Sequence, residues 1–399
     1  MKHALALFTL CLALPPTLVG CSSDTGGAND DAPVDDGFDD VRQALLESTV
    51  VVVRGELDTL VGQAEALQSA TDAWVASGTA EDRAAAQDAW SSAMGTWQRL
   101  ELIQVGPAGA MGVAVGGEDL RDEIYSWPLV NPCRVDQEIV EQAYTDAAAF
   151  AAEPVNVRGL DALEYLLFVD GTDNACAPNS GINTSGDWAA IDADALNSRR
   201  AAYAATLAEL LTATATDLRG RWSDAAFGGE LTLAVADTFR TRQDALNALS
   251  DAMFYLDKEV KDMKLAVPTG LTDCAEATCP DAVESPWSGR SLDNVRDNIA
   301  GFAMLYHGGA ADDPNAVGFH DLLEAVGAAD LAEGMDVSIG DIVMWTDDLD
   351  GTMVELIATD NASVIEVHDR IKTLTDLLKT QFVGVLDLEL PDRAAGDND

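Results

Sequence analysis

Two carboxylates, three residues apart, are the side chains with the clearest potential for chemistry. Asp161 and Glu164 lie in the run 157–168, in which Leu160, Leu163 and Leu167 recur at the spacing of one helix face. Residues three apart are neighbours on a helix, so both carboxylates border this apolar stripe. Like charges in such a place repel each other and resist losing water unless a cation or hydrogen-bond donors compensate them. We therefore predict a polar site here that binds a metal cation.

We add Glu101 to this site as a third carboxylate. It follows Trp90 and Trp97 on one side of a predicted helix over 79–104. Three carboxylates are hard oxygen donors, which suit Ca²⁺, Mg²⁺, Mn²⁺ or Fe³⁺ better than Zn²⁺ or Cu²⁺. The alternatives are that Glu101 is a solvated acid near a helix end, and that Asp161 is hydrogen-bonded to the backbone or to Arg99 in a structural polar site.

The sequence around these carboxylates resembles the imelysin-like family. That family carries Gly-x-His-x-x-Glu followed by an aromatic residue and two leucines, and this chain has Gly159-x-Asp161-x-x-Glu164-Tyr165-Leu166-Leu167. A similar Ser-Trp-Pro precedes the motif, and a similar Glu-Ser element with further serines and an asparagine-bearing helix follows more than a hundred residues later. The positions that match are Trp127, Gly159, Glu284, Ser285, Ser288, Ser291 and Asn298.

The resemblance implies an all-α fold of two helical bundles and a role in iron-regulated processes or iron uptake. It also implies that Asp161 and Glu164 stand where the family's proposed ligands stand. Because Asp161 replaces a histidine, we expect a hard metal, iron or calcium, in preference to zinc. The family was filed historically among insulin-cleaving peptidases.

Peptidase chemistry has little support in the residues themselves. The chain contains no His-Glu-x-x-His sequence and no Gly-x-Ser-x-Gly sequence. We interpret His307, His320 and His368 as surface or capping residues. We therefore expect a non-catalytic protein. Two alternatives stay open: a divergent metallopeptidase with Glu164 as general base, and a cell-surface scaffold that binds a peptide or polysaccharide.

The N-terminus predicts export and lipid anchoring. Residues 1–20 form a short basic lead and an apolar run that ends in Leu18-Val19-Gly20, directly before Cys21. This is typical of a bacterial lipobox, in which Cys21 is lipidated; the alternative is an ordinary signal peptide with a chance cysteine. Residues 21–38 are polar and acidic and predict a flexible tether. We expect a cell-envelope protein anchored on the periplasmic side or at the surface of the outer membrane.

The remaining cysteines agree with an exported protein, and the net charge limits its partners. Chain order suggests the disulfides Cys133–Cys176 and Cys274–Cys279, although four cysteines allow three pairings. The formal net charge of −46 repels nucleic acid and anionic lipid, so we exclude both as direct partners. The expected partners are the membrane, through the lipid anchor at Cys21, and components of a metal-uptake system.

Apolar periodicity predicts helices throughout and no strand. We divide the chain into an N-terminal bundle (39–225), a C-terminal bundle (226–390) and an acidic tail (391–399). One long helix is expected over 229–267, with the charged run 257–264 on its solvated face. Later helices are expected at about 317–332, 339–358 and 361–387, with a turn at Gly334. The sequence Gly318–Glu324 resembles the central motif with one extra residue, and we favour chance as the explanation.

Overall fold

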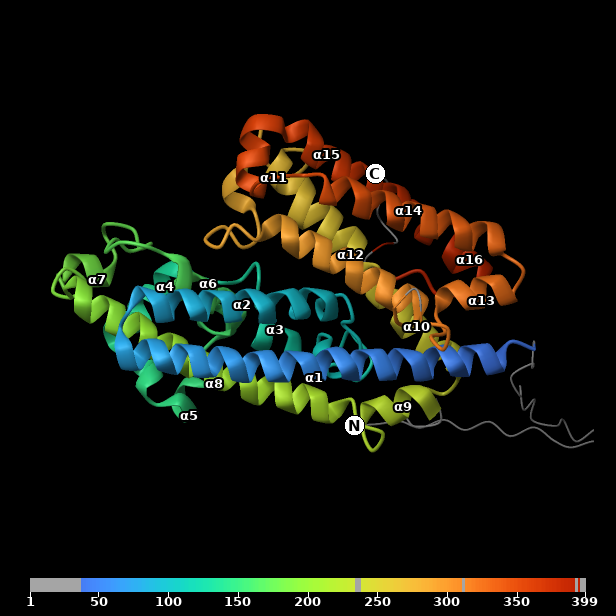
Figure 1. The fold of residues 1–399 in the computed structure, drawn as a ribbon, viewed down its shortest axis with the longest axis horizontal. Coiled ribbons are helices and arrows are strands. Elements are labelled where there is room, and N and C mark those ends of the chain that lie inside the picture. The colour runs from blue at the N-terminus through green and yellow to red at the C-terminus, as the bar shows by residue number, and fades with distance from the viewer. Residues whose placement is uncertain (1–36, 234–237, 311–312, 392–393, 395–399) are drawn as a thin grey trace, which may run out of the picture. The chain divides into compact units, whose positions relative to one another are not determined.

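The regular elements of the structure, a computed structural model, are all helices. It describes residues 37–233, 238–310, 313–391 and 394, and every regular element within these ranges is an α-, 3₁₀- or π-helix (Figure 1). The all-α prediction is therefore confirmed. The predicted signal peptide, Cys21, most of the tether and most of the acidic tail lie outside the described residues.

Three long helices form the N-terminal half of the fold. Helix α1 (Asp39–Ser77) packs against both α2 (Ala80–Glu101) and α8 (Ala193–Arg221), and Figure 1 shows the three running alongside one another. Their buried residues recur at three- and four-residue steps, as a helix with one buried face requires. The short helices α3 (Leu120–Ile124), α4 (Pro132–Glu141), α5 (Ala147–Phe150), α6 (Gly159–Phe168) and α7 (Gly181–Thr184) lie between α2 and α8 in the chain.

The C-terminal half contains three longer helices, α12, α14 and α15, among several short ones. Helix α12 packs against α2 on the N-terminal half and against α14 within its own half, while α15 packs against α14 and a π-helix, η4. The division into two domains near residue 225 stays a prediction. The elements are α9 (Phe227–Leu233), α10 (Arg242–Met253), η4 (Leu256–Ala266), α11 (Val267–Thr269), α12 (Ser291–His307), α13 (Phe319–Ala325), α14 (Ala329–Asp347), α15 (Met353–Leu377) and α16 (Val383–Val385).

Several predicted helix boundaries are wrong. The stretches 317–332 and 339–358 are each interrupted, because α13 ends at Ala325, α14 spans Ala329–Asp347 and α15 begins at Met353. The stretch 229–267 is not one helix, because α9 ends at Leu233 and α10 starts anew after Thr241, whose hydroxyl accepts a hydrogen bond from the Asp244 backbone N–H at 3.1 Å. Gly334 is not a turn but lies inside α14. An interior glycine costs a helix only about 1 kcal/mol, which the buried residues of α14 on either side of it offset.

The charged run 257–264 does not form a solvated face. Asp257, Lys261 and Lys264 are 0%, 0% and 1% exposed, respectively. They lie in η4, where the hydrogen bonds of a π-helix span five residues and the wider turn changes which side chains face the core. Asp257 is paired with Lys261 at 3.6 Å and with Lys379 of the π-helix η6 (Leu378–Phe382) at 2.9 Å. The predicted i,i+4 pairing is present between Asp257 and Lys261, but the pair is buried and not solvated.

Both expected disulfides are present in the structure. Cys133, in the first turn of α4, is bonded to Cys176, in the segment that follows α6. Cys274 is bonded to Cys279 in the loop between α11 and α12. The first bridge closes a long loop and restricts the unfolded chain, so it fixes the segments on either side of α6.

The packing of α12 on α2 depends on a glycine. A Cβ atom on Gly301 would lie 2.3 Å from the carbonyl oxygen of Arg99, a backbone atom that cannot move aside. The substitution Gly301→Ala should therefore push the two helices apart, and overpacking of this kind costs roughly 1–3 kcal/mol. We expect the urea midpoint of unfolding to fall accordingly.

Gly334→Ala is the matched control for this prediction. Gly334 is also a helical glycine, but a Cβ atom there would meet no atom within 4 Å. This substitution should raise the urea midpoint or leave it unchanged, because alanine favours a helix over glycine by about 1 kcal/mol. Equal losses of stability in both variants would contradict the role assigned to Gly301.

Candidate metal centre

Gly159 determines how the helix that carries the central motif begins. Its φ of +81° is unfavourable for other residues, and a Cβ atom there would lie 2.8 Å from the carbonyl oxygen of Ile124 in α3. The first turn of α6 therefore lies directly against the α3 backbone. The indole N–H of Trp90 in α2 donates to the Leu160 carbonyl at 2.8 Å and fixes this turn from another side. The glycine of the motif thus places both acidic residues that follow it.

Asp161 is buried and accepts hydrogen bonds only from uncharged donors among the described residues. One carboxylate oxygen accepts the Ser126 hydroxyl at 2.6 Å, and the other accepts the Ala162 backbone N–H at 2.9 Å. Arg99, the cation considered as its partner from the sequence, pairs with Glu56 and Asp297 instead. Burial raises the pKa of Asp161 to about 7, although these two hydrogen bonds act in the opposite direction.

Glu164 connects the central motif to the later Glu-Ser element, which lies before α12. One of its oxygens, Oε1, accepts three hydrogen bonds: the backbone N–H of Trp287 at 3.1 Å, that of Ser288 at 2.8 Å and the Ser288 hydroxyl at 2.7 Å. Burial raises the pKa of Glu164 to about 8, the bonds from Ser288 lower it, and the negative charges of Glu284 and Asp161 raise it further. The two motifs, far apart in sequence, therefore meet at Glu164.

Glu101 does not join Asp161 and Glu164 as a third ligand. Its side chain is 0% exposed and pairs with Arg121 at 2.7 Å and with Lys264 at 3.4 Å. Burial alone would raise its pKa, but these two cations outweigh burial and hold the pKa below the usual value. Glu101 is thus neither a solvated acid nor part of a three-carboxylate cluster. It belongs to an ion-pair network with Arg121 and Lys264.

Lys264 is the centre of that network, and two of the family-motif residues, Glu284 and Asn298, contact its ammonium. Its ammonium lies 3.0 Å from Glu284 and donates to the side-chain oxygens of Gln98 at 2.7 Å and Asn298 at 2.8 Å. Glu284 also accepts the Tyr125 hydroxyl at 2.8 Å. Further hydrogen bonds hold the loop before α12: the Ser291 hydroxyl donates to the Glu284 carbonyl, and Asn294 donates to the Ser285 hydroxyl.

The sequence contained an indication that Lys264 has a specific role, but the helical pattern predicted that it faces solvent. Three of the six lysines of the chain fall within the run 258–264. In a protein with so few lysines, such clustering indicates a specific use.

The charges around the site do not balance. Four acidic residues, Glu101, Glu284, Asp161 and Glu164, face two basic residues, Lys264 and Arg121. Both basic residues pair with Glu101, and Lys264 also pairs with Glu284. No ion pair reaches Asp161 or Glu164 within the described part of the chain, although the charge of Arg121 lowers the pKa of Asp161. A proton or a cation would balance the remaining charge of these two buried carboxyls.

A cavity of about 420 Å³ opens onto these two carboxyls. Its walls are mostly apolar, and Trp287 packs edge-on against Tyr165 at 5.1 Å between ring centres. The two carboxyls offer oxygen donors, so this donor set fits a hard cation. The lining residues are Tyr125, Trp127, Pro128, Val130, Pro132, Asp161, Glu164, Met263, Val267, Asp281, Ala282, Val283, Ser285, Pro286 and Trp287.

A second cluster was missed from the sequence. Within the described ranges, one group of three histidine, cysteine or acidic side chains brings its ligand atoms within 4.8 Å of one another: His307, His320 and Asp336. His307 and His320 were interpreted as surface or capping residues. They come from α12 and α13, with Asp336 on α14, so no local spacing in the sequence joins them.

Comparison with known proteins identifies the family. The imelysin family model matches residues 54–381, which is most of the chain. The chain belongs to the imelysin family. A comparison with curated proteins finds no match.

Two solved structures share the fold of this imelysin-family chain. An imelysin-like protein from Psychrobacter arcticum 273-4 is 16% identical, with a TM-score of 0.67, and the match covers 88% of this chain and 96% of that one. A protein described as an iron-regulated protein A precursor, from Parabacteroides distasonis ATCC 8503, is 20% identical, with a TM-score of 0.66 and coverage of 86% and 95%. None of the described helices has the length and apolar character needed to cross a membrane.

The raised pKa values predict how stability depends on pH when no metal is bound. Below about pH 4, Asp161 and Glu164 are protonated in both the folded and the unfolded chain. Between about pH 4 and about pH 8 the unfolded chain has lost these protons and the folded chain retains them, so the free energy of unfolding falls as pH rises. The double variant Asp161→Asn/Glu164→Gln should show a shallower fall in denaturant titrations with a chelator present.

Asp58→Asn is the control for the pH series. Asp58 is an exposed acid whose hydrogen bond to Arg219 lowers its pKa. The stability that this interaction adds to the folded chain is therefore lost only when the pH falls below the ordinary pKa of an aspartate. Its removal should leave the slope between about pH 5 and about pH 8 unchanged. A double variant with the same slope as the unmodified protein would contradict the raised pKa values.

Proposed function

We propose that this imelysin-family protein is a lipid-anchored envelope protein that binds a hard metal cation, iron or calcium, at Asp161 and Glu164, and that it serves metal uptake rather than catalysis. The observation that supports this most is the charge imbalance beside an open cavity. Lys264 and Arg121 pair with Glu101 and Glu284, whereas Asp161 and Glu164 line the cavity with no basic partner among the described residues. A bound cation would supply the missing charge.

The surroundings of the two carboxyls suit a cation site with supporting hydrogen bonds. Ser126 and Ser288 donate to Asp161 and Glu164, respectively, and would hold the carboxylates in orientation while a cation binds. All three hydrogen bonds to Glu164 go to Oε1, so Oε2 is left for a metal. The cavity is larger than a bare ion needs, so water or a chelator that arrives with the metal would complete the coordination. The iron-regulated name of one structural neighbour favours iron.

Calorimetric titration tests this proposal. The purified protein is titrated with Ca²⁺, with Fe²⁺ in the absence of oxygen, and with Fe³⁺ as its citrate complex. We expect saturable binding of at least one ion, lost in Asp161→Ala/Glu164→Ala. The affinity should increase with pH between about 6 and about 8, because the metal displaces protons from both carboxyls.

Asp136→Asn is the matched control for the titration. Asp136 is another buried carboxyl whose pKa is raised by burial, to about 6, but it accepts the Tyr165 hydroxyl at 2.9 Å and does not line the cavity. This variant should bind the metal as the unmodified protein does. Identical titrations for the unmodified protein and the Asp161/Glu164 double variant would refute the site.

The lipid anchor has a separate test. Cys21 follows Leu18-Val19-Gly20, so Cys21→Ser should abolish lipidation. We expect the unmodified protein to sediment with the membrane fraction and to partition into detergent. The variant should be released into the aqueous fraction. A Cys21→Ser protein that still fractionates with membranes would contradict anchoring at this residue.

The aromatic walls of the cavity favour one alternative, a scaffold that binds a peptide or polysaccharide. Trp127, Pro286 and Trp287 offer the flat apolar surface that such a ligand would contact. A ligand of this class would bind equally well in excess chelator, whereas metal-dependent binding would not survive it.

A further inference from the structure

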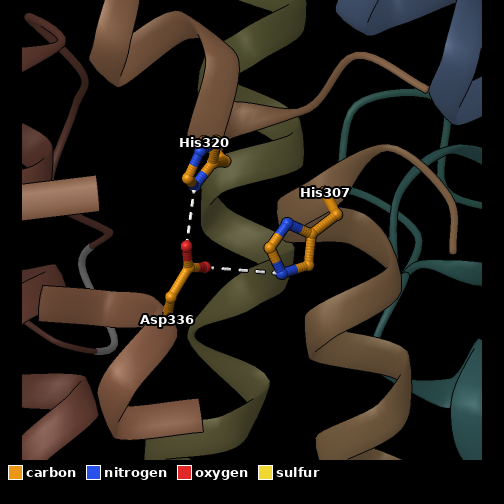
Figure 2. A group of neighbouring side chains, drawn as sticks. All are labelled: His307, His320 and Asp336. Atoms are coloured by element: carbon orange, nitrogen blue, oxygen red, sulfur yellow. Dashed lines mark ion pairs between the residues drawn. The ribbon is translucent and has the colours of Figure 1, made fainter. Parts of the chain in front are cut away.

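Three helices bring two histidines and an aspartate together outside the cavity at Asp161 and Glu164. His307 is the last residue of α12, His320 lies in the first turn of α13, and Asp336 lies within α14. Figure 2 shows both imidazole rings directed at the carboxylate of Asp336 from different elements. The carboxylate oxygens lie 3.5 Å from His307 Nε2 and 3.1 Å from His320 Nδ1.

We propose that His307, His320 and Asp336 form a second metal site, which binds one divalent first-row transition metal ion, Fe²⁺ or Zn²⁺. Two imidazoles and one carboxylate are the donor set that borderline metals prefer, and three protein ligands leave coordination positions open. The donors differ from those at Asp161 and Glu164, which are oxygen only. The proposal is therefore independent of the proposed function.

The distances within the cluster are those between ligands of one ion. In a tetrahedral site with bonds of about 2.1 Å, two ligand atoms lie about 3.4 Å apart. The separation of His307 Nε2 from Asp336 Oδ1 is 3.5 Å and that of His320 Nδ1 from Asp336 Oδ2 is 3.1 Å, so each histidine lies near this value from one oxygen of the carboxylate. One ligand atom from each of the three residues lies within 4.8 Å of the other two, so the three side chains are close enough to converge on one ion.

Hydrogen bonding does not account for this approach. His320 Nδ1 and Asp336 Oδ1 are both buried atoms, and neither makes a hydrogen bond to any described residue. Buried polar atoms are normally paired, because leaving one unpaired costs about 1–3 kcal/mol. An ion between the rings and the carboxylate would satisfy both atoms at once.

The backbone holds the three ligands in place without a metal. A Cβ atom on Gly318 would lie 2.2 Å from the Tyr306 carbonyl oxygen, so the start of α13 lies directly against the end of α12. The Tyr306 hydroxyl donates to the Ala332 carbonyl at 3.1 Å and ties α12 to α14 one turn before Asp336. A pre-arranged set of ligands loses little conformational entropy on binding.

The surroundings of the cluster also favour a cation. Glu324 lies 3.7 Å from His320 Nε2, the ring nitrogen that faces away from Asp336, and carboxylates in this position commonly orient a metal-bound histidine. The cluster lines a cavity of about 1030 Å³ whose described lining includes Glu56, Asp313 and Asp321 but no lysine or arginine. Water or a chelator bound to the metal therefore has space.

Zinc titration in competition with a chromophoric chelator tests the proposal on the purified protein. Excess Mg²⁺ is present to occupy the acidic surface, because carboxylate oxygens suit this hard cation. We expect one tightly bound Zn²⁺ per chain. His307→Ala, His320→Ala and Asp336→Asn should each weaken binding by about tenfold or more, and Co²⁺ should give visible absorption bands that the same variants lose.

Two control variants separate this site from the rest of the protein. His368→Ala removes the third histidine outside the predicted signal peptide, which lies on α15 beside Asp369, and should leave Zn²⁺ affinity unchanged. Asp161→Asn/Glu164→Gln should also leave it unchanged, whatever that variant does to Ca²⁺ or iron. Circular dichroism verifies that each variant is folded. Unchanged Zn²⁺ affinity in folded His307→Ala and His320→Ala, or no stoichiometric Zn²⁺ in the unmodified protein, would overturn the proposal.

Discussion

The buried ammonium of Lys264 is the interaction on which the rest of the site depends. It contacts Glu101 and Gln98 on α2, Glu284 in the loop before α12, and Asn298 on α12 itself. One side chain of η4 thereby joins the two halves of the fold and compensates acids from both. Removing one member of a buried ion pair leaves an uncompensated charge, which commonly costs about 3–5 kcal/mol. Because the Lys264 ammonium is paired with Glu101 and Glu284, Asp161 and Glu164 on α6 have no share in it and are available to a different cation.

The sequence predicted the parts of this arrangement that follow local rules. The spacing of Leu160, Leu163 and Leu167 indicated α6, and the same spacing placed Asp161 and Glu164 at its buried border. Gly-x-Asp-x-x-Glu and the later Glu-Ser element were identified as parts of one pattern, and they meet through the bonds from Ser288 to Glu164. Glu101 was predicted as a third metal ligand, but in the structure its partners are the cations Arg121 and Lys264.

What the sequence could not predict depends on departures from regular helices and on tertiary approach. Lys264 was placed in solvent because i,i+4 spacing assumes an α-helix, whereas η4 is a π-helix that turns its charged residues inward. His307, His320 and Asp336 lie on three helices, and their meeting depends on the contact of the α12 and α13 backbones at Gly318. Where the family motif has histidine this chain has Asp161, while two of its few histidines meet Asp336 elsewhere. The two proposed sites therefore differ in donor type.

A crystal structure of the protein with Mn²⁺ at about pH 8, measured at the manganese absorption edge, tests the central claim most directly. Mn²⁺ is a hard cation that scatters anomalously, and at this pH Asp161 and Glu164 release their protons readily. We expect an anomalous peak within bonding distance of both carboxylates, with Glu101 still paired to Lys264 and Arg121. Clear density for the two side chains without an anomalous peak between them would contradict the claim that Asp161 and Glu164 bind a metal.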